Sequence, residues 1–289
     1  MEPGRASRTA LGAAGHRAAH QVLEGGCVLS DPLAIRILGT SAEELIERAR
    51  MDPTKRGLRL FIAARSRFAE DSLRLALARG VRQLVVLGAG LDTLAYRSAL
   101  AEHLRIFEVD HPATQAWKRE RLAAEAIEIP SSLSFAPIDF ERQTLAAGLS
   151  AAGFEPQQHT FFTWLGVVPY LSEAAVFATL GFIASLPNGA HAVFDYANPR
   201  ASIPEQARAV HDALAARVAA AGEELRTFFE TDPLHARLRA LGFDEIEDLG
   251  PRQIAERFFP HEARPRSRGG GGHIIRVRLL RDGHQSSLP

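Results

Sequence analysis

The sequence predicts an α/β fold built on a doubly wound, seven-stranded sheet that is mostly parallel, with an antiparallel last strand. Two observations predict it. Short apolar segments alternate with helical patterns from residue 83 onward, which is typical of parallel sheets covered by helices. The chain is also large and apolar enough, at 289 residues and 46% hydrophobic content, to bury such a sheet.

Seven segments have the length and apolar content of strands. They are Gln83–Leu87, Arg105–Val109, Leu133–Pro137, Thr160–Leu165, Ala190–Tyr196, Asp244–Asp248 and His273–Leu280. Helical patterns separate most of them, at Leu94–Glu102, Ala113–Glu125, Gln143–Ala152, Glu173–Leu186 and Pro233–Leu241. No helix of normal length is predicted between the last two strands, so the terminal strand is expected to insert antiparallel to its neighbours.

Two helical regions fall outside this alternation. We expect residues 1–80 to form an amino-terminal cap or lid, and residues 81–289 to form the ligand-binding core. A helical insertion is expected within that core at about residues 198–230. Both additions should stand over the carboxyl ends of the strands, where open α/β sheets bind ligands, and keep water out of the site.

Composition excludes several classes of protein. A formal net charge of zero gives no global attraction for nucleic acid or an anionic membrane. The single cysteine, Cys27, excludes an intramolecular disulfide and makes a structural zinc site improbable. We identify no signal peptide, and Pro187-Asn188-Gly189 interrupts the longest uncharged stretch. We expect a cytoplasmic monomer or homodimer that acts on a small molecule, without a metal.

The apolar run Leu84–Leu87 ends at Gly88-Ala89-Gly90, and Asp92 and Thr93 follow. Glycine carries no Cβ and tolerates positive φ, so a ligand can lie against bare backbone in such a turn. The polar pair can then open a helix whose first N–H groups point back toward the ligand. The stretch predicts a nucleotide-type site, with an ordinary strand-to-helix turn as the alternative.

Two features argue against a dinucleotide in this site. Thr93 stands where the dinucleotide fingerprint has a third Gly or Ala, and the chain has no P-loop lysine motif. Glu108 and Asp110 follow Gly88 by 20 and 22 residues, the spacing at which a carboxylate reaches ribose hydroxyls in such folds. The residues therefore favour an adenosyl ligand without phosphates, with either acid on the ribose.

Together these residues resemble the leucine carboxyl methyltransferase family, in its bacterial branch of S-adenosylmethionine-dependent O-methyltransferases. The most specific matches are the stretch from Gly88 to Thr93 and Glu108-Val109-Asp110-His111-Pro112. Further matches lie at residues 7–11, 31–34, 64–68, 138–140 and 166–172, in the order of the family. The resemblance implies a class I methyltransferase fold and S-adenosyl-L-methionine as cofactor.

The resemblance also implies cofactor contacts. Arg65 would pair with the methionine carboxylate, a task that suits the guanidinium fork, although pairing with the nearby Glu70 or Asp71 is an alternative. The remaining cofactor positions are the turn Gly88, Ala89 and Gly90, the ribose carboxylate Asp110, and Asp139 with Phe140 at the adenine.

The chain departs from the family at Trp164. Many members have a glutamate near the cofactor just before the glycine of the fourth-strand segment. An indole can form a wall against the cofactor or the substrate, or it can be ordinary core, but it cannot act as a carboxylate.

The acceptor would be a carboxylate or a hydroxyl. A carboxylate needs no general base at pH 7 but does need a cationic anchor, whereas a hydroxyl benefits from a base. Candidate anchors are Arg200, Arg208, Arg217 and Arg268, candidate bases are His111 and His211, and Tyr170 and Tyr196 are candidate pocket residues. Surface or packing roles are the alternatives for the histidines and tyrosines, and we assign no base.

We therefore expect a small-molecule O-methyltransferase of bacterial secondary metabolism that methylates a carboxylate or a hydroxyl. Carboxyl methylation of a protein or peptide C-terminus, an NAD-linked oxidoreductase on the same sheet, and a non-catalytic adenosyl-binding relative are the alternatives.

Overall fold

The computed structural model describes residues 8–39, 42–139, 143–220, 224–260 and 271–280. Its centre is one seven-stranded sheet with the order β3-β2-β1-β4-β5-β7-β6. The strands are β1 (Gln83–Leu87), β2 (Arg105–Asp110), β3 (Leu133–Pro137), β4 (Thr160–Trp164), β5 (Ala190–Ala197), β6 (Glu245–Leu249) and β7 (Gly272–Leu279). β7 runs antiparallel to both β5 and β6, and the other pairs are parallel.

The predicted strands are all present, with ends within one residue of the predicted ones. β1 is buried on both faces, as its continuous apolar run predicts: Val85 and Leu87 join one hydrophobic cluster, and Leu84 and Val86 join the other.

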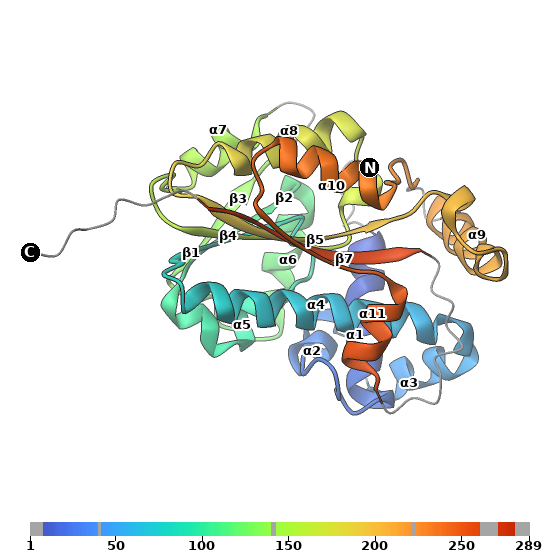
Figure 1. The fold of residues 1–289 in the computed structure, drawn as a ribbon. Coiled ribbons are helices and arrows are strands. Elements are labelled where there is room, and N and C mark those ends of the chain that lie inside the picture. The colour runs from blue at the N-terminus through green and yellow to red at the C-terminus, as the bar shows by residue number, and fades with distance from the viewer. Residues whose placement is uncertain (1–7, 40–41, 140–142, 221–223, 261–270, 281–289) are drawn as a thin grey trace, which may run out of the picture.

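Helices cover both faces of the sheet (Figure 1). α7 (Leu145–Ala151), α8 (Glu173–Ala184) and α10 (Thr231–Ala240) lie on one face, and α4 (Arg56–Leu77), α5 (Leu94–Arg97), α6 (Pro112–Ala124) and α11 (Pro251–Phe258) lie on the other. The remaining helices are α1 (Arg8–Leu23), α2 (Leu33–Leu38), α3 (Ala42–Met51) and α9 (Glu205–Ala220), with 3-10 turns η1 (Pro53–Lys55), η2 (Ala99–His103), η3 (Val168–Tyr170) and η4 (Arg200–Ser202).

Two helix predictions differ from the structure. The segment predicted as one helix from Leu94 to Glu102 is divided into α5 and η2, because Ser98 is extended and its hydroxyl accepts from the Leu100 N–H. A short helix, α11, also lies between the last two strands where none of normal length was predicted. It begins at Pro251, whose fixed φ suits the first helical position.

The helices expected as a cap divide into two roles. Phe68 and Leu73 of α4 share a hydrophobic cluster with Leu84 and Ile106 of the sheet. α1 packs across α4, α2 and α3 instead. α4 is therefore part of the sheet's own core, although it lies inside the segment expected as a cap.

The insertion after β5 contains α9, which projects beyond the end of the sheet in Figure 1. Its two ends are fastened close together: the Phe229 N–H donates to the Ala197 carbonyl, and the Asn198 amide donates to the Phe229 carbonyl at 2.9 Å. Among the helices in the described ranges, none combines the length and the apolar character that crossing a membrane requires.

Candidate cofactor site

A crevice of about 560 Å³ opens at the carboxyl ends of β1, β2 and β4. Its floor is the turn after β1, and its walls come from α1, α4, the loop after β4 and the segment that follows α9. Elements far apart in the sequence meet there because the strand order reverses between β1 and β4, the position at which open α/β sheets bind ligands.

The turn after β1 has the backbone geometry that its glycines allow. Gly88 and Gly90 have φ angles of 64° and 45°. A Cβ on Gly88 would lie 2.3 Å from a Val167 methyl carbon, and one on Gly90 would lie 3.0 Å from the Ala10 Cβ. The turn therefore needs glycine for its conformation and for the close approach of its neighbours, and it presents bare backbone to the crevice.

The structure distinguishes the two acids of β2. Asp110 lines the crevice, and its carboxylate accepts from the N–H groups of Gly90 and His111. Glu108 lies two residues before Asp110 on β2, under α6, and is 1% exposed. Its carboxylate pairs with Lys118 at 2.7 Å and accepts from the Tyr96 hydroxyl. Asp110 is therefore the acid that faces the crevice.

Burial determines the electrostatics of these acids. It raises the pKa of the Asp110 carboxyl above its usual value, although the Gly90 and His111 N–H groups oppose the shift. Burial also raises the pKa of Glu108, which Lys118 opposes. The pKa of Tyr96 is raised by burial and by the adjacent Glu108 charge, so this phenol keeps its proton as a hydrogen-bond donor.

Arg65 pairs with a carboxylate from the sheet and not with Glu70 or Asp71. Its Nη1 donates to Asp195 of β5 at 2.9 Å, and the other oxygen of Asp195 accepts from the Gly166 N–H. The acids expected as alternatives pair with Arg97 and Arg67. The Arg65 Nε is buried without a hydrogen-bond partner in the described part of the chain, so this edge of the guanidinium is unsatisfied there.

The structure brings five predicted cofactor residues together in the crevice: Arg65, Gly88, Ala89, Gly90 and Asp110. Asp139 follows β3 and is not among the lining residues, and Phe140 lies outside the described residues. Trp164 is 3% exposed in the core with its ring 6.3 Å from that of Phe194. Its successor Leu165, directly after β4, lines the crevice instead, because successive residues of a strand face opposite sides.

Of the predicted substrate residues, Tyr170 lines the crevice, and Tyr196 and Arg208 do not. The Tyr196 hydroxyl donates to Asp248 at 2.6 Å in a part-buried network that joins β5, β6 and β7. The Arg208 Nε donates to the Ile203 carbonyl, and Arg200 pairs with Asp212. The Arg217 side chain and Arg268 lie outside the described residues.

Neither candidate base faces the crevice. The His111 ring accepts from the Ala113 N–H and so caps the start of α6. His211 is 7% exposed and packs against Phe228. His211 thus has a packing role, and His111 a capping role.

Sequence reasoning missed two parts of the wall. Ala10, Ala13 and Arg17 of α1 line the crevice, and their helical spacing was the available signal, because it puts all three on one face. Glu224 and Arg226 also line it from the extended segment after α9, where no pattern in the sequence marks them.

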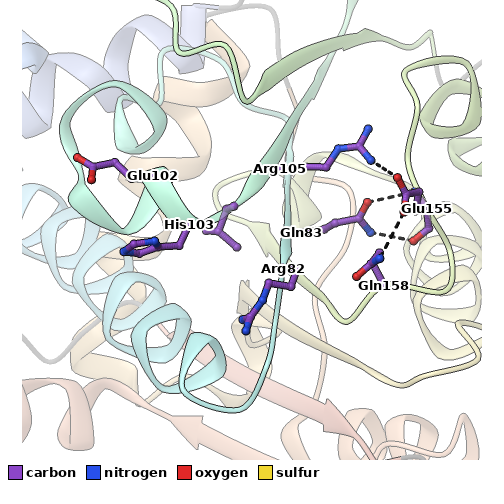
Figure 2. Close-up of a pocket in the computed structure, with 8 residues that line it drawn as sticks. Arg82, Gln83, Glu102, His103, Arg105, Glu155 and Gln158 are labelled. Atoms are coloured by element: carbon purple, nitrogen blue, oxygen red, sulfur yellow. Dashed lines mark hydrogen bonds and ion pairs between the residues drawn. The ribbon is translucent and has the colours of Figure 1, made fainter.

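A second hollow of about 500 Å³ lies at the opposite ends of the strands, where β1 and β2 begin (Figure 2). Gln83 and Arg105 converge there on Glu155, so its principal polar groups satisfy one another. It lacks a glycine turn and lies away from the carboxyl ends of the strands. The crevice at the Gly88 turn is therefore the candidate site. The described ranges contain no group of three or more His, Cys, Asp or Glu side chains able to hold a metal ion.

A seven-stranded sheet in this order, with a glycine turn after β1 facing an acid at the end of β2, defines a class I methyltransferase. Solved structures support the fold. The "putative methyltransferase" from Thermobifida fusca YX has a TM-score of 0.59 at 17% identity and covers 97% of both chains. A "duf574 family protein" from Streptomyces avermitilis has a TM-score of 0.55 at 15% identity over 91% of this chain and 96% of its own.

Sequence comparison identifies the family. The profile described as "Leucine carboxyl methyltransferase" matches residues 10–184. "Putative S-adenosyl-L-methionine-dependent methyltransferase YktD" of Bacillus subtilis strain 168 is 32% identical over 75% of this chain and 74% of its own length. A similarly named protein of Saccharopolyspora erythraea is 37% identical over 42% of each chain. The chain belongs to the leucine carboxyl methyltransferase family, and it is an S-adenosylmethionine-dependent methyltransferase.

Proposed function

We propose that this protein transfers the methyl group of S-adenosylmethionine to an oxygen of a small molecule, with a carboxylate as the favoured acceptor. The observation that carries the proposal is the placing of one cation and one anion at the glycine turn of the crevice. Arg65, held from behind by Asp195, offers a guanidinium that fits the methionine carboxylate, and Asp110 beside the bare Gly88–Gly90 backbone fits a ribose.

Unsatisfied groups in the crevice support this fit. The Arg65 Nε is a buried donor without a partner, and the Thr114 hydroxyl beside Asp110 is likewise unpartnered in the described part of the chain. Buried polar groups are normally hydrogen-bonded, so these two await a ligand. When bound, the cofactor supplies an electrophilic methyl group on a sulfonium. Arg65 would hold its carboxylate, and Asp110 its ribose hydroxyls.

The adenine end is a separate part of the proposal. We assign it to Asp139 and Phe140 after β3, on the family resemblance, and to an apolar wall at the end of β4. Leu165 supplies that wall at the surface of the crevice, whereas Trp164 packs in the cluster on the other face of the sheet.

The absence of a histidine from the described lining favours a carboxylate acceptor. A carboxylate is already ionised at pH 7 and needs positioning and a dry site, whereas a hydroxyl profits from a base. α1 and the segment after α9 form the walls that would exclude water. We further propose that the chain acts in the cytoplasm, in bacterial secondary metabolism, as a monomer or homodimer.

Two measurements test the proposal. Isothermal titration should detect binding of S-adenosylhomocysteine and give no heat of binding with NAD. Binding of NAD in place of S-adenosylhomocysteine would overturn the cofactor assignment. Labelled cofactor should then transfer its methyl group to members of a carboxylate panel in preference to phenols. Preference for phenols would overturn the assignment of a carboxylate as the acceptor. Transfer only to peptide C-termini would favour a protein substrate, and binding without transfer to any panel would favour a non-catalytic relative.

A further inference from the structure

Six charged side chains of the described residues line the crevice, and four of them already have partners. Arg17 donates to Asp31 and to the Leu91 carbonyl, and Arg65 pairs with Asp195. Asp92 accepts from the Leu94 N–H, and Asp110 accepts from Gly90 and His111. The other two are Glu224 and Arg226, for which the described residues provide no hydrogen bond or ion pair.

Arg226 combines a fixed backbone with an unpaired guanidinium. Its N–H donates to the Pro169 carbonyl at 2.7 Å, and the next N–H, of Thr227, donates to the same oxygen. The Thr227 hydroxyl also donates to the Leu171 carbonyl. The segment is thus fastened to the loop after β4, which carries the lining residue Tyr170, while the Arg226 side chain is exposed to the crevice.

The position of Arg226 separates it from the groups assigned to the cofactor. Arg65 comes from α4 and Asp110 from β2, whereas Arg226 follows the insertion on the wall that carries Tyr170 and Leu171. With Arg17 and Arg65 both paired, Arg226 is the cation of the described lining that is available to a second ligand.

An arginine fork on the reacting carboxylate would hinder the reaction. A bidentate pair occupies both oxygens, and the carboxylate loses its charge as it becomes an ester. A cation on it would therefore stabilise the bound substrate more than the transition state. The fork is better used on an anionic group of the acceptor that does not react.

We propose that Arg226 anchors a second, non-reacting carboxylate of the acceptor, so that the preferred acceptors are dianions or hydroxy acids with a separate methyl-accepting oxygen. This inference rests on the proposed methyl transfer. Glu224 lies two residues earlier on the same extended segment and opposes the anchor, because its charge repels the bound anion.

The test uses matched acceptors on the full-length protein saturated with S-adenosylhomocysteine. Adipate is compared with hexanoate, and isophthalate with benzoate, by isothermal titration. The variants are Arg226→Ala, Arg226→Lys and Glu224→Gln. The control is Arg200→Ala, which removes an exposed arginine that pairs with Asp212 away from the crevice lining.

We expect the unaltered protein to bind each dicarboxylate about tenfold more tightly than its monocarboxylate partner, the effect of one charge-assisted pair. Arg226→Ala should abolish that preference, Arg226→Lys should restore part of it, and Glu224→Gln should strengthen dicarboxylate binding about two- to fivefold. Arg200→Ala should change nothing. In turnover assays with labelled cofactor, Arg226→Ala should raise KM for dicarboxylates and leave kcat nearly unchanged.

No preference for dicarboxylates in the unaltered protein, or an equal preference in Arg226→Ala, overturns the anchor. Because Arg226 is exposed, its replacement should leave the fold intact. Circular dichroism and the melting temperature of each variant check this. Failure of the anchor can be distinguished from failure of the proposed function. Absence of S-adenosylhomocysteine binding to the unaltered protein contradicts the cofactor assignment, whereas intact cofactor binding without a dicarboxylate preference contradicts only the anchor.

Discussion

Arg65 and Asp195 form a nearly buried ion pair between α4 and β5, with side-chain exposures of 11% and 6%. Such a pair contributes little net stability because desolvation offsets the Coulombic attraction. It does hold a guanidinium edge in a fixed direction at the rim of the crevice. We therefore propose that the pair serves binding more than folding.

Replacing Arg65 with lysine should weaken S-adenosylhomocysteine binding by about 1.5–3 kcal/mol, because lysine keeps the charge toward Asp195 but loses the second N–H edge. Isothermal titration measures the change. Arg67→Lys is the matched control on the same helix, since Arg67 pairs with Asp71 at an exposed site. Equal affinities in the two variants would contradict the role of Arg65.

Residue-level prediction from sequence succeeded where a motif fixes the backbone and stopped where partners are distant. Gly88 and Gly90 could be predicted because few other residues tolerate their turn. Asp195, the partner of Arg65, lies 130 residues away in sequence, and no local pattern connects the two. Glu108 and Asp110 share one face of β2, so only the depth of burial under α6 distinguishes them.

The turn after β1 is an element whose geometry depends on glycine. Gly88→Ala should destabilise the fold by about 1–3 kcal/mol, since φ is positive and the new methyl would overlap Val167. It should also abolish cofactor binding. Gly181→Ala in α8 should instead stabilise by about 0.5–1 kcal/mol, because a Cβ there meets nothing within 4 Å and alanine favours the helix. Urea unfolding monitored by circular dichroism compares the two, and similar effects would contradict the argument.

A hydrogen-bond network around Asp248 on β6 holds the start of the insertion that follows β5. Its carboxylate accepts from Tyr196 and lies 2.8 Å from ring nitrogens of both His235 and His273. The other His273 nitrogen contacts the Asn198 amide oxygen, at the point where the insertion begins. The network thus ties the last two strands to the segment that leads to the crevice wall.

Asp248 should give the fold an acid-sensitive component. Burial alone would raise its pKa, but the hydrogen bonds from His273, Tyr196 and His235 outweigh burial and lower it. A lowered carboxyl pKa stabilises the fold above the unfolded value near 4, and that stability is lost as pH falls through the folded value. Asp248→Asn should therefore cost about 2–3 kcal/mol at pH 7 and flatten the acid limb of a urea-unfolding series from pH 7 to 3. An unchanged acid limb would contradict this, and Glu256→Gln, which removes an exposed carboxylate paired with Arg252, is the control.

Strands were predictable because apolar runs buried on both faces leave little ambiguity, as in β1 and β4. Short helices were harder to predict from the sequence. α11 has eight residues, only two of them buried, and its polar face obscures the pattern. The division of the predicted helix at Ser98 depends on a side-chain cap that propensity alone does not reveal.

At the scale of the whole molecule, the crevice joins parts of the chain that fold against different partners. The sheet contributes the glycine turn and Asp110, and α1 contributes Ala10, Ala13 and Arg17. Arg17 connects the two through the Leu91 carbonyl. The division between a cap of residues 1–80 and a core of residues 81–289 stays a prediction, and α4 belongs by its packing to the sheet.

A ligand that contacts both parts should couple their stabilities. At a concentration of 100 Kd, S-adenosylhomocysteine stabilises the folded state by about 2.7 kcal/mol, which should raise the melting temperature by about 4–5 °C. Hydrogen exchange should slow in α1 and in residues 88–92. It should change little in α8, which lies on the opposite face of the sheet and acts as the internal control (Figure 1). Protection confined to the β1 turn would show that α1 does not close over the cofactor, because a wall that contacts the ligand cannot open without losing that contact.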